Sequence, residues 1–113
     1  MKKYDIIAVD FDGTLCSDCY PDIGKPNMPL IRLLKAFRNE GCRIILWTCR
    51  CGGELEKAVQ WCKEFGLEFD KVNRNTDEIL EKYGSDSRKI YADVYIDDKA
   101  CFPWEVNACR KEE

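Results

Sequence analysis

The sequence predicts an α/β fold in which a parallel β-sheet carries helices on both faces. Two observations support this fold class. Short runs rich in β-branched and aromatic residues alternate with longer segments whose apolar residues recur at helical spacing. Each of the longer segments stops at a glycine, as helices commonly do. Because strands that alternate with helices are joined by right-handed crossovers, the strands are expected to run parallel within a single domain that spans residues 1–113.

The first half of the chain is expected to hold two strands and one helix. Residues 4–9 form an apolar run that is typical of a buried strand. Residues 16–29 are polar and contain several prolines and a glycine, which predicts a loop or a short hairpin. A helix is expected over residues 29–38, ending before Gly41. Residues 42–48 are short and rich in branched and aromatic side chains, which predicts a second buried strand.

The second half repeats the alternation. A helix is expected over residues 54–65 and a weaker strand over residues 67–72. A short helix is expected over residues 77–83, followed by a strand over residues 92–96. The tail from Pro103 has room for one or two helical turns.

Composition narrows the class of protein. The chain has 113 residues, of which 45% are hydrophobic, and a formal charge of -3, so a nucleic-acid partner is not indicated. No apolar stretch approaches the length of a membrane span, and we expect a cytoplasmic protein without a membrane partner.

The eight cysteines are expected to be reduced thiols, since no export signal is recognised. Cys42 and Cys62 lie in apolar patterns and are expected to act as small hydrophobes.

Polar side chains follow three of the expected strands. Asp10 and Asp12 come after the first strand, Thr48 ends the second, and Asp97 and Asp98 follow the last. Ligands of open α/β sheets bind at the carboxyl ends of the strands, so these side chains are expected to converge on one crevice. The carboxylates would repel one another there unless a cation lay between them.

The residue types favour a hard divalent metal. The chain contains no histidine, which excludes a histidine-based catalytic triad and a histidine-ligated metal. Magnesium binds one or two carboxylates and borrows oxygens from a phosphorylated substrate. The sequence therefore predicts a Mg²⁺ site for phosphoryl transfer.

Three segments resemble motifs of the haloacid dehalogenase superfamily of phosphatases. Its first motif is matched by Asp-Phe-Asp-Gly-Thr at residues 10–14. Its second, a hydroxyl residue that ends a hydrophobic strand, looks like residues 44–48, and its fourth, an acidic pair after a strand, looks like residues 94–98. The order of the motifs agrees over essentially the whole chain. The resemblance implies a three-layer, Rossmann-like domain and a phosphomonoester hydrolase.

The resemblance also implies roles for individual residues. Asp10 would be the nucleophile that forms an aspartyl-phosphate, and Asp12 would be the acid and then the base. Magnesium would bind the Asp10 carboxylate, the Asp12 backbone carbonyl and the acidic pair, with Asp98 as the direct ligand and Asp97 behind it. Thr48 would donate a hydrogen bond to the phosphoryl group.

The third motif of the superfamily is a lysine or arginine whose position is loosely specified. Lys89, just before the last strand, is our choice, and Arg88 and Arg74 are lesser candidates. Arg50 follows Thr48 at the rim of the expected crevice and is read either as a substrate contact or as a solvated arginine.

Larger members of the superfamily insert a cap domain, for which this chain has no room. Residues 16–29 and 66–87 are the segments available to cover part of the site. The partner is expected to be a phosphorylated small molecule or an exposed phosphoester. An open crevice suggests a bulky, exposed or macromolecular phosphoester, or else a partner subunit of a homo-oligomer that serves as the lid.

Two alternatives remain open at this point. One is a domain of the same fold that binds phosphate or metal without turnover. The other is a thiol site, because Cys16, Cys19, Cys49 and Cys51 lie just beyond the first two strands and four thiolates suit zinc. The intact acids of the first motif count against the first alternative, and the cramped spacing of Cys49 and Cys51 counts against the second.

Overall fold

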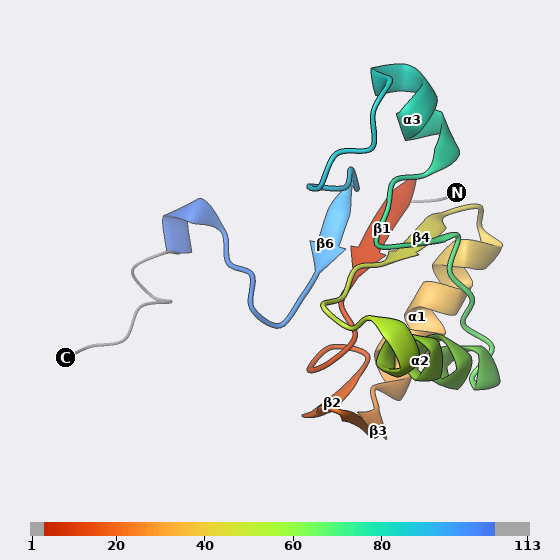
Figure 1. Ribbon diagram of the computed structural model, residues 1–113, viewed down its shortest axis with the longest axis vertical. Coiled ribbons are helices and arrows are strands. Elements are labelled where there is room, and N and C mark those ends of the chain that lie inside the picture. Colours follow the sequence, from red (N-terminus) through yellow and green to blue (C-terminus); the bar gives the residue numbers. More distant parts are fainter. Residues whose placement is uncertain (1–3, 106–113) are drawn as a thin grey trace.

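A parallel sheet forms the centre of the protein in a computed structural model that describes residues 4–105 (Figure 1). Four strands, all parallel, lie in the order β5-β4-β1-β6. Their bounds are β1 (Ile6–Val9), β4 (Arg43–Leu46), β5 (Lys71–Val72) and β6 (Val94–Ile96). The prediction of an α/β fold with a parallel sheet is therefore confirmed.

Two helices pack against one face of this sheet. Alternate residues of a strand point to opposite faces, and Ile7 and Val9 of β1 lie in a buried cluster with Ile31 of α1 and Cys62 of α2. The two helices are α1 (Met28–Asn39) and α2 (Gly52–Glu64). The first turn of α1 is capped by Asn27, whose side-chain oxygen accepts a hydrogen bond from a backbone N–H. Both helices occupy nearly the residues expected from the sequence.

The other face of the sheet carries a second, smaller core. Ile6 and Ala8 of β1 and Ile45 of β4 pack there with Ile79 of the third helix. This helix, α3 (Asp77–Tyr83), has the bounds that its sequence pattern predicts, and it ends at a glycine with a left-handed backbone, φ 74°.

A β-hairpin follows the loop after β1. Its strands, β2 (Cys16–Cys19) and β3 (Asp22–Pro26), pair antiparallel. Gly24 allows their close approach, because a Cβ there would lie 2.1 Å from Ser17 Oγ. The same Ser17 oxygen accepts a hydrogen bond of 2.8 Å from Lys25 N. Of the two structures expected for this segment, the hairpin is the one that forms.

The placement of the cysteines differs partly from expectation. Cys16 was expected in a loop, but it is buried in β2 because the chain after β1 folds inward and packs Leu15 and Cys16 into the main core. Cys42 and Cys62 are buried, as expected for small hydrophobes.

The described part of the chain ends in a short helical turn. A short 3₁₀ turn, η1 (Pro103–Glu105), begins at the expected residue, and the remainder of the expected helical tail lies outside the described residues.

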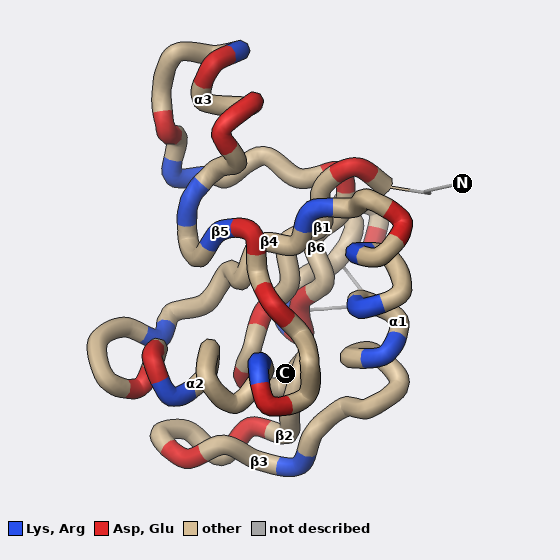
Figure 2. Tube along the Cα trace, turned by 90° about the vertical axis from the view of Figure 1, so that its right-hand side faces the viewer, with Lys and Arg blue, Asp and Glu red and all other residues tan. Residues whose placement is uncertain are grey.

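Charged residues of both signs are dispersed over the trace, apart from a short basic stretch along α1 (Figure 2). Within residues 4–105, none of the helices combines the length and apolar character needed to cross a bilayer.

Candidate active site

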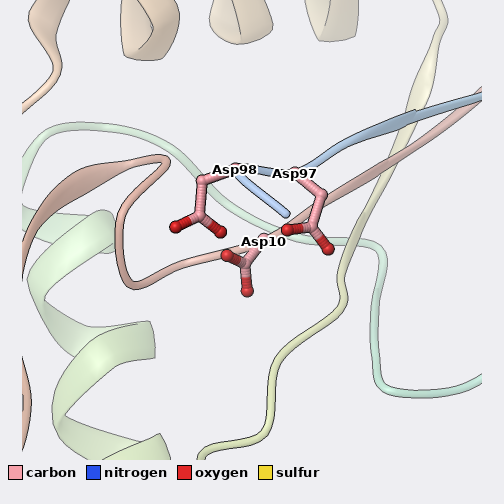
Figure 3. A group of neighbouring side chains, drawn as sticks. All are labelled: Asp10, Asp97 and Asp98. Carbon is pink, nitrogen blue, oxygen red and sulfur yellow. The ribbon is translucent and has the colours of Figure 1, made fainter. Parts of the chain in front are cut away.

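Three carboxylates meet where β1 and β6 end. Asp10 directly follows β1, and Asp97 and Asp98 directly follow β6, which pairs with β1. A backbone hydrogen bond of 2.9 Å from Asp10 N to Ile96 O extends this pairing. One oxygen from each carboxylate lies within 4.8 Å of the others, and Figure 3 shows the three side chains directed toward a common space. The expected convergence of these residues is confirmed.

Asp10 lies in an environment that disfavours the negative charge of its carboxylate. Partial burial raises the pKa of Asp10 to about 6, and the negative charges of Asp97 and Asp98 add to the rise. A hydrogen bond from the backbone of Phe11 and one of 3.3 Å from Thr14 Oγ1 act in the opposite direction without cancelling it. A carboxylate in this position gains from a nearby cation.

Gly13 permits the close packing of the loop after β1 on the acidic pair. Its φ is +82°, and a Cβ built there would lie 2.3 Å from Asp98 Oδ2. Any side chain would both strain the backbone and displace the Asp98 carboxylate. The glycine of the first motif is therefore required by the geometry of the cluster.

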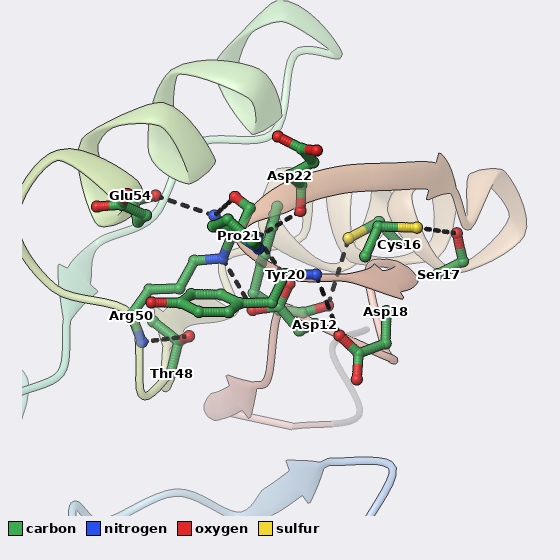
Figure 4. Close-up of polar contacts among 12 residues, drawn as sticks. Asp12, Cys16, Ser17, Asp18, Tyr20, Pro21, Asp22, Thr48, Arg50 and Glu54 are labelled. Carbon is green, nitrogen blue, oxygen red and sulfur yellow. Dashed lines mark hydrogen bonds and ion pairs between the residues drawn. The ribbon is translucent and has the colours of Figure 1, made fainter.

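Asp12 is held by a buried arginine. Arg50 Nε donates to Asp12 Oδ2 and Arg50 Nη2 to Asp12 Oδ1, both at 2.8 Å, so the pair is bidentate (Figure 4). The Arg50 side chain is 1% exposed, whereas that of Asp12 is 20% exposed. The Asp12 carboxylate is thus fixed in orientation but still reaches solvent. Coordination of a metal by its backbone oxygen stays a prediction.

The remaining N–H groups of Arg50 are also used. Nη1 donates to the carbonyls of Pro21 and Glu54, and Nη2 donates to the carbonyl of Asp22. A guanidinium has five N–H donors, and all five are engaged. This differs from both sequence readings of Arg50, since it is neither solvated nor free to contact a substrate. It joins the hairpin, the start of α2 and Asp12 instead.

Thr48 lies beyond the end of β4 with its hydroxyl proton available. Its backbone N–H donates to Asn73 Oδ1 at 2.8 Å, and its Oγ1 accepts a hydrogen bond of 3.1 Å from Arg50 N. Asn73 adopts φ 56°, an uncommon conformation that aims its side chain at the loop after β4. The Thr48 hydroxyl is an acceptor in these contacts, so it retains its proton for a ligand.

The cations expected near the carboxylates are placed differently. The ammonium of Lys89 lies 5.6 Å from the centroid of the Tyr95 ring. Arg88 pairs with Asp86 at 3.1 Å, and Arg74 is exposed. Among the described residues, it is Lys99 that contacts the cluster, with its Nζ 3.1 Å from Asp98 Oδ2. Sequence reasoning missed it, although its position one residue after the acidic pair was the signal that could have found it.

If the protein turns over phosphoesters, as the sequence leads us to expect, the Lys99→Ala variant should lose about tenfold or more in that turnover, because it removes the positive charge that stands beside Asp98 and Asp10. Lys89→Ala is the matched control and should lose much less. Steady-state kinetics of both variants check this expectation. A large loss in Lys89→Ala with little change in Lys99→Ala would restore Lys89 as the cation of the third motif.

The thiol alternative finds no support in the described part of the chain. Cys16 is buried, whereas Cys19, Cys49 and Cys51 are exposed, and all four are free thiols. Among residues 4–105, the group with ligand atoms close enough to share a metal consists of the three aspartates and includes no sulfur. In the described part of the chain, the four cysteines are therefore not gathered into a group whose sulfur atoms could share a metal.

Comparison with known proteins identifies one informative relative. No protein-family model and no curated protein matches the sequence. A solved structure of a conserved protein from Bacteroides thetaiotaomicron is similar, with 40% sequence identity, a TM-score of 0.74, and coverage of 90% of this chain and 84% of its own. At this identity and coverage, the chain belongs to the same protein family as that conserved Bacteroides protein.

Proposed function

We propose that the protein is a magnesium-dependent phosphomonoester hydrolase of the haloacid dehalogenase type, which acts through an aspartyl-phosphate. The observation that carries the proposal is the convergence of Asp10, Asp97 and Asp98, whose ligand oxygens lie within 4.8 Å of one another. The partly buried Asp10 and the separately fixed Asp12 are two carboxyl groups in different environments. In the proposal Asp10 is the nucleophile and Asp12 is the proton donor.

The donor set fits magnesium. All three groups offer carboxylate oxygen, which hard divalent cations prefer, and Asp97 and Asp98 are exposed, so water and phosphate oxygens would be the further ligands. Bound there, Mg²⁺ would neutralise charge on the carboxylates and on the phosphoryl group. Asp98 is our choice for the direct ligand, because it aligns with the aspartate of the commoner glycine–aspartate form of the superfamily's fourth motif.

The chain's own residues supply the covalent steps of the proposal. A carboxylate oxygen of Asp10 attacks phosphorus, the bond from phosphorus to the leaving oxygen breaks, and Asp12 donates its proton to that oxygen. Water then attacks the phosphorus of the aspartyl-phosphate and gives a proton to Asp12. The bond to Asp10 breaks, which releases inorganic phosphate and restores both carboxyl groups.

Two residues assist these steps in the proposal. Each Asp12 oxygen accepts one hydrogen bond from Arg50 and keeps a second lone pair that can take up a proton. The two hydrogen bonds hold the Asp12 side chain in one orientation through both steps. Thr48, with its hydroxyl proton free, donates to a phosphoryl oxygen.

We further propose that the domain has the three-layer arrangement of this superfamily and lacks a cap. The two cores on opposite faces of the sheet support the layers. The β2–β3 hairpin is then the cover nearest to Asp12, to which it is joined through Arg50.

Magnesium dependence tests the proposed function. Turnover of an aryl phosphate should be lost after exhaustive chelation and restored by Mg²⁺, since the acidic cluster otherwise repels an anionic substrate. The Asp98→Asn variant should need a higher Mg²⁺ concentration for half-maximal turnover, whereas Glu81→Gln, in an exposed residue of α3, should not.

Two outcomes would contradict the proposal. Full turnover after chelation would refute the role of the metal. Binding of Mg²⁺ in calorimetry without turnover of any phosphoester would instead identify a non-catalytic binding domain.

A further inference from the structure

Tyr20 places an exposed aromatic ring beside the proposed proton donor. The residue lies in the turn between β2 and β3 and is 61% exposed. Its ring centroid is 5.1 Å from the central carbon of the Arg50 guanidinium, the group that holds Asp12. Figure 4 shows the ring, the guanidinium and Asp12 gathered at one place. A second ring, Phe11, lies 4.9 Å from the same guanidinium carbon but is fully buried.

The backbone around Tyr20 is fixed by the same arginine. Arg50 donates to the carbonyls of Pro21 and Asp22, the two residues that follow Tyr20. On the other side, Asp18 Oδ1 accepts a hydrogen bond from Tyr20 N at 3.4 Å. The ring is therefore positioned before any ligand arrives, which lowers the entropy cost of using it as a binding surface.

The groups around Tyr20 limit the kinds of leaving group that can bind on this side of the site. In the proposed reaction the leaving group departs on the side of Asp12, because Asp12 protonates it. Arg50 has no N–H left for a ligand on that side, as all five are engaged. The neighbouring hairpin residues Asp18 and Asp22 are exposed acids, which disfavour an anionic leaving group. What remains is the π face of Tyr20.

We propose that Tyr20 is a stacking platform that selects phosphomonoesters whose leaving group is uncharged and carries an aromatic or heteroaromatic ring. This inference rests on the proposed function and adds the substrate class. Stacked aromatic pairs contribute about 0.5–1.5 kcal/mol beyond area burial, which corresponds to a preference of about 2- to 13-fold.

Benzyl phosphate and cyclohexylmethyl phosphate test the inference. Both are esters of primary alcohols and have leaving groups of similar size, but only benzyl is flat. Wild-type protein should show a higher kcat/KM for benzyl phosphate by about 2- to 13-fold, with the difference mainly in KM. The ratio should persist in Tyr20→Phe and fall to about one in Tyr20→Leu, which keeps an apolar side chain over Arg50 without a π face.

Tyr83→Leu is the matched control, since Tyr83 is 59% exposed on α3 and outside the site, and this variant should keep the wild-type ratio. Equal kcat/KM for the two esters in wild-type protein would overturn the inference and leave the proposed function intact. A preference that survives in Tyr20→Leu would also overturn it. Failure to hydrolyse either ester in the presence of Mg²⁺ would overturn the proposed function, and this inference with it.

Discussion

The Asp10→Asn variant is expected to lose turnover by about 10⁴-fold or more, because an amide oxygen cannot replace the carboxylate as a nucleophile toward phosphorus. Single-turnover measurements with an aryl phosphate check this, and trapping of phosphate on the wild-type chain supplies the positive signal. Glu81→Gln, in an exposed residue of α3, is the control and should stay near wild-type activity. Retained turnover in Asp10→Asn would rule out the covalent route.

The Asp10→Asn substitution should also raise the free energy of unfolding of the metal-free protein at neutral pH. The pKa of Asp10 is raised to about 6 from 3.8, so folding favours its protonated form. The free energy of unfolding of the wild type therefore falls as the pH rises from about 4 through about 6, because the folded protein loses the proton of Asp10. Above that range the full cost of the Asp10 charge is present. Two pKa units correspond to about 3 kcal/mol, which we reduce to about 1 kcal/mol because the side chain is partly exposed to solvent.

Thermal unfolding in the presence of chelator measures this penalty. Asp10→Asn should exceed the wild type in stability at pH 8, and the gap should narrow at pH 5, where most of the wild-type Asp10 carboxyl is protonated. A variant that is less stable than the wild type at pH 8 would show that the acidic cluster is not strained.

The Arg50→Ala variant is expected to lose about 3–5 kcal/mol of unfolding free energy, the usual cost of removing one partner of a buried ion pair. The substitution removes five hydrogen bonds and leaves the Asp12 carboxylate and the hairpin carbonyls without a donor. Chemical denaturation measures the loss. Arg38→Ala removes a single ion-pair contact of 3.3 Å to Asp70 on the surface and should lose about 1 kcal/mol or less.

Arg50→Lys keeps the test informative if Arg50→Ala does not fold. An ammonium is a compact donor that cannot reach both Asp12 oxygens and three carbonyls at once, so this variant should be intermediate in stability and reduced in turnover. The loss in turnover should be greater for alkyl than for aryl phosphates, because only a poor leaving group needs the proton from Asp12. Equal losses for both classes of ester would indicate that Arg50 supports the fold alone.

Much of this architecture could be predicted because it follows from local patterns. Apolar runs mark the buried strands, and a glycine closes α3 at the expected residue. The convergence of Asp10 with Asp97 and Asp98 could be predicted because parallel neighbouring strands end at the same edge of a sheet.

The partners of individual side chains could not be predicted in this way. Arg50 and Asp12 are 38 residues apart, and their pairing depends on how the hairpin folds over the start of α2. Lys89 and Lys99 flank the same strand, and only the course of the backbone decides which ammonium reaches the cluster. The burial of Cys16 likewise depends on an inward turn that its polar neighbours conceal.

The position of β6 in the sheet has a consequence for how the protein is made and how it opens. β6 has three residues, lies at the edge of the sheet and pairs with β1 across nearly the whole chain, with Val94 opposite Ile7. During synthesis the two halves of the acidic cluster can meet only after β6 and Asp98 have emerged. In the finished protein, detachment of this one short strand would disassemble the cluster while β5, β4 and β1 remain paired. The acidic cluster therefore depends on a short edge strand, and any ligand that bridges Asp10 to Asp98 fastens that strand to the rest of the protein.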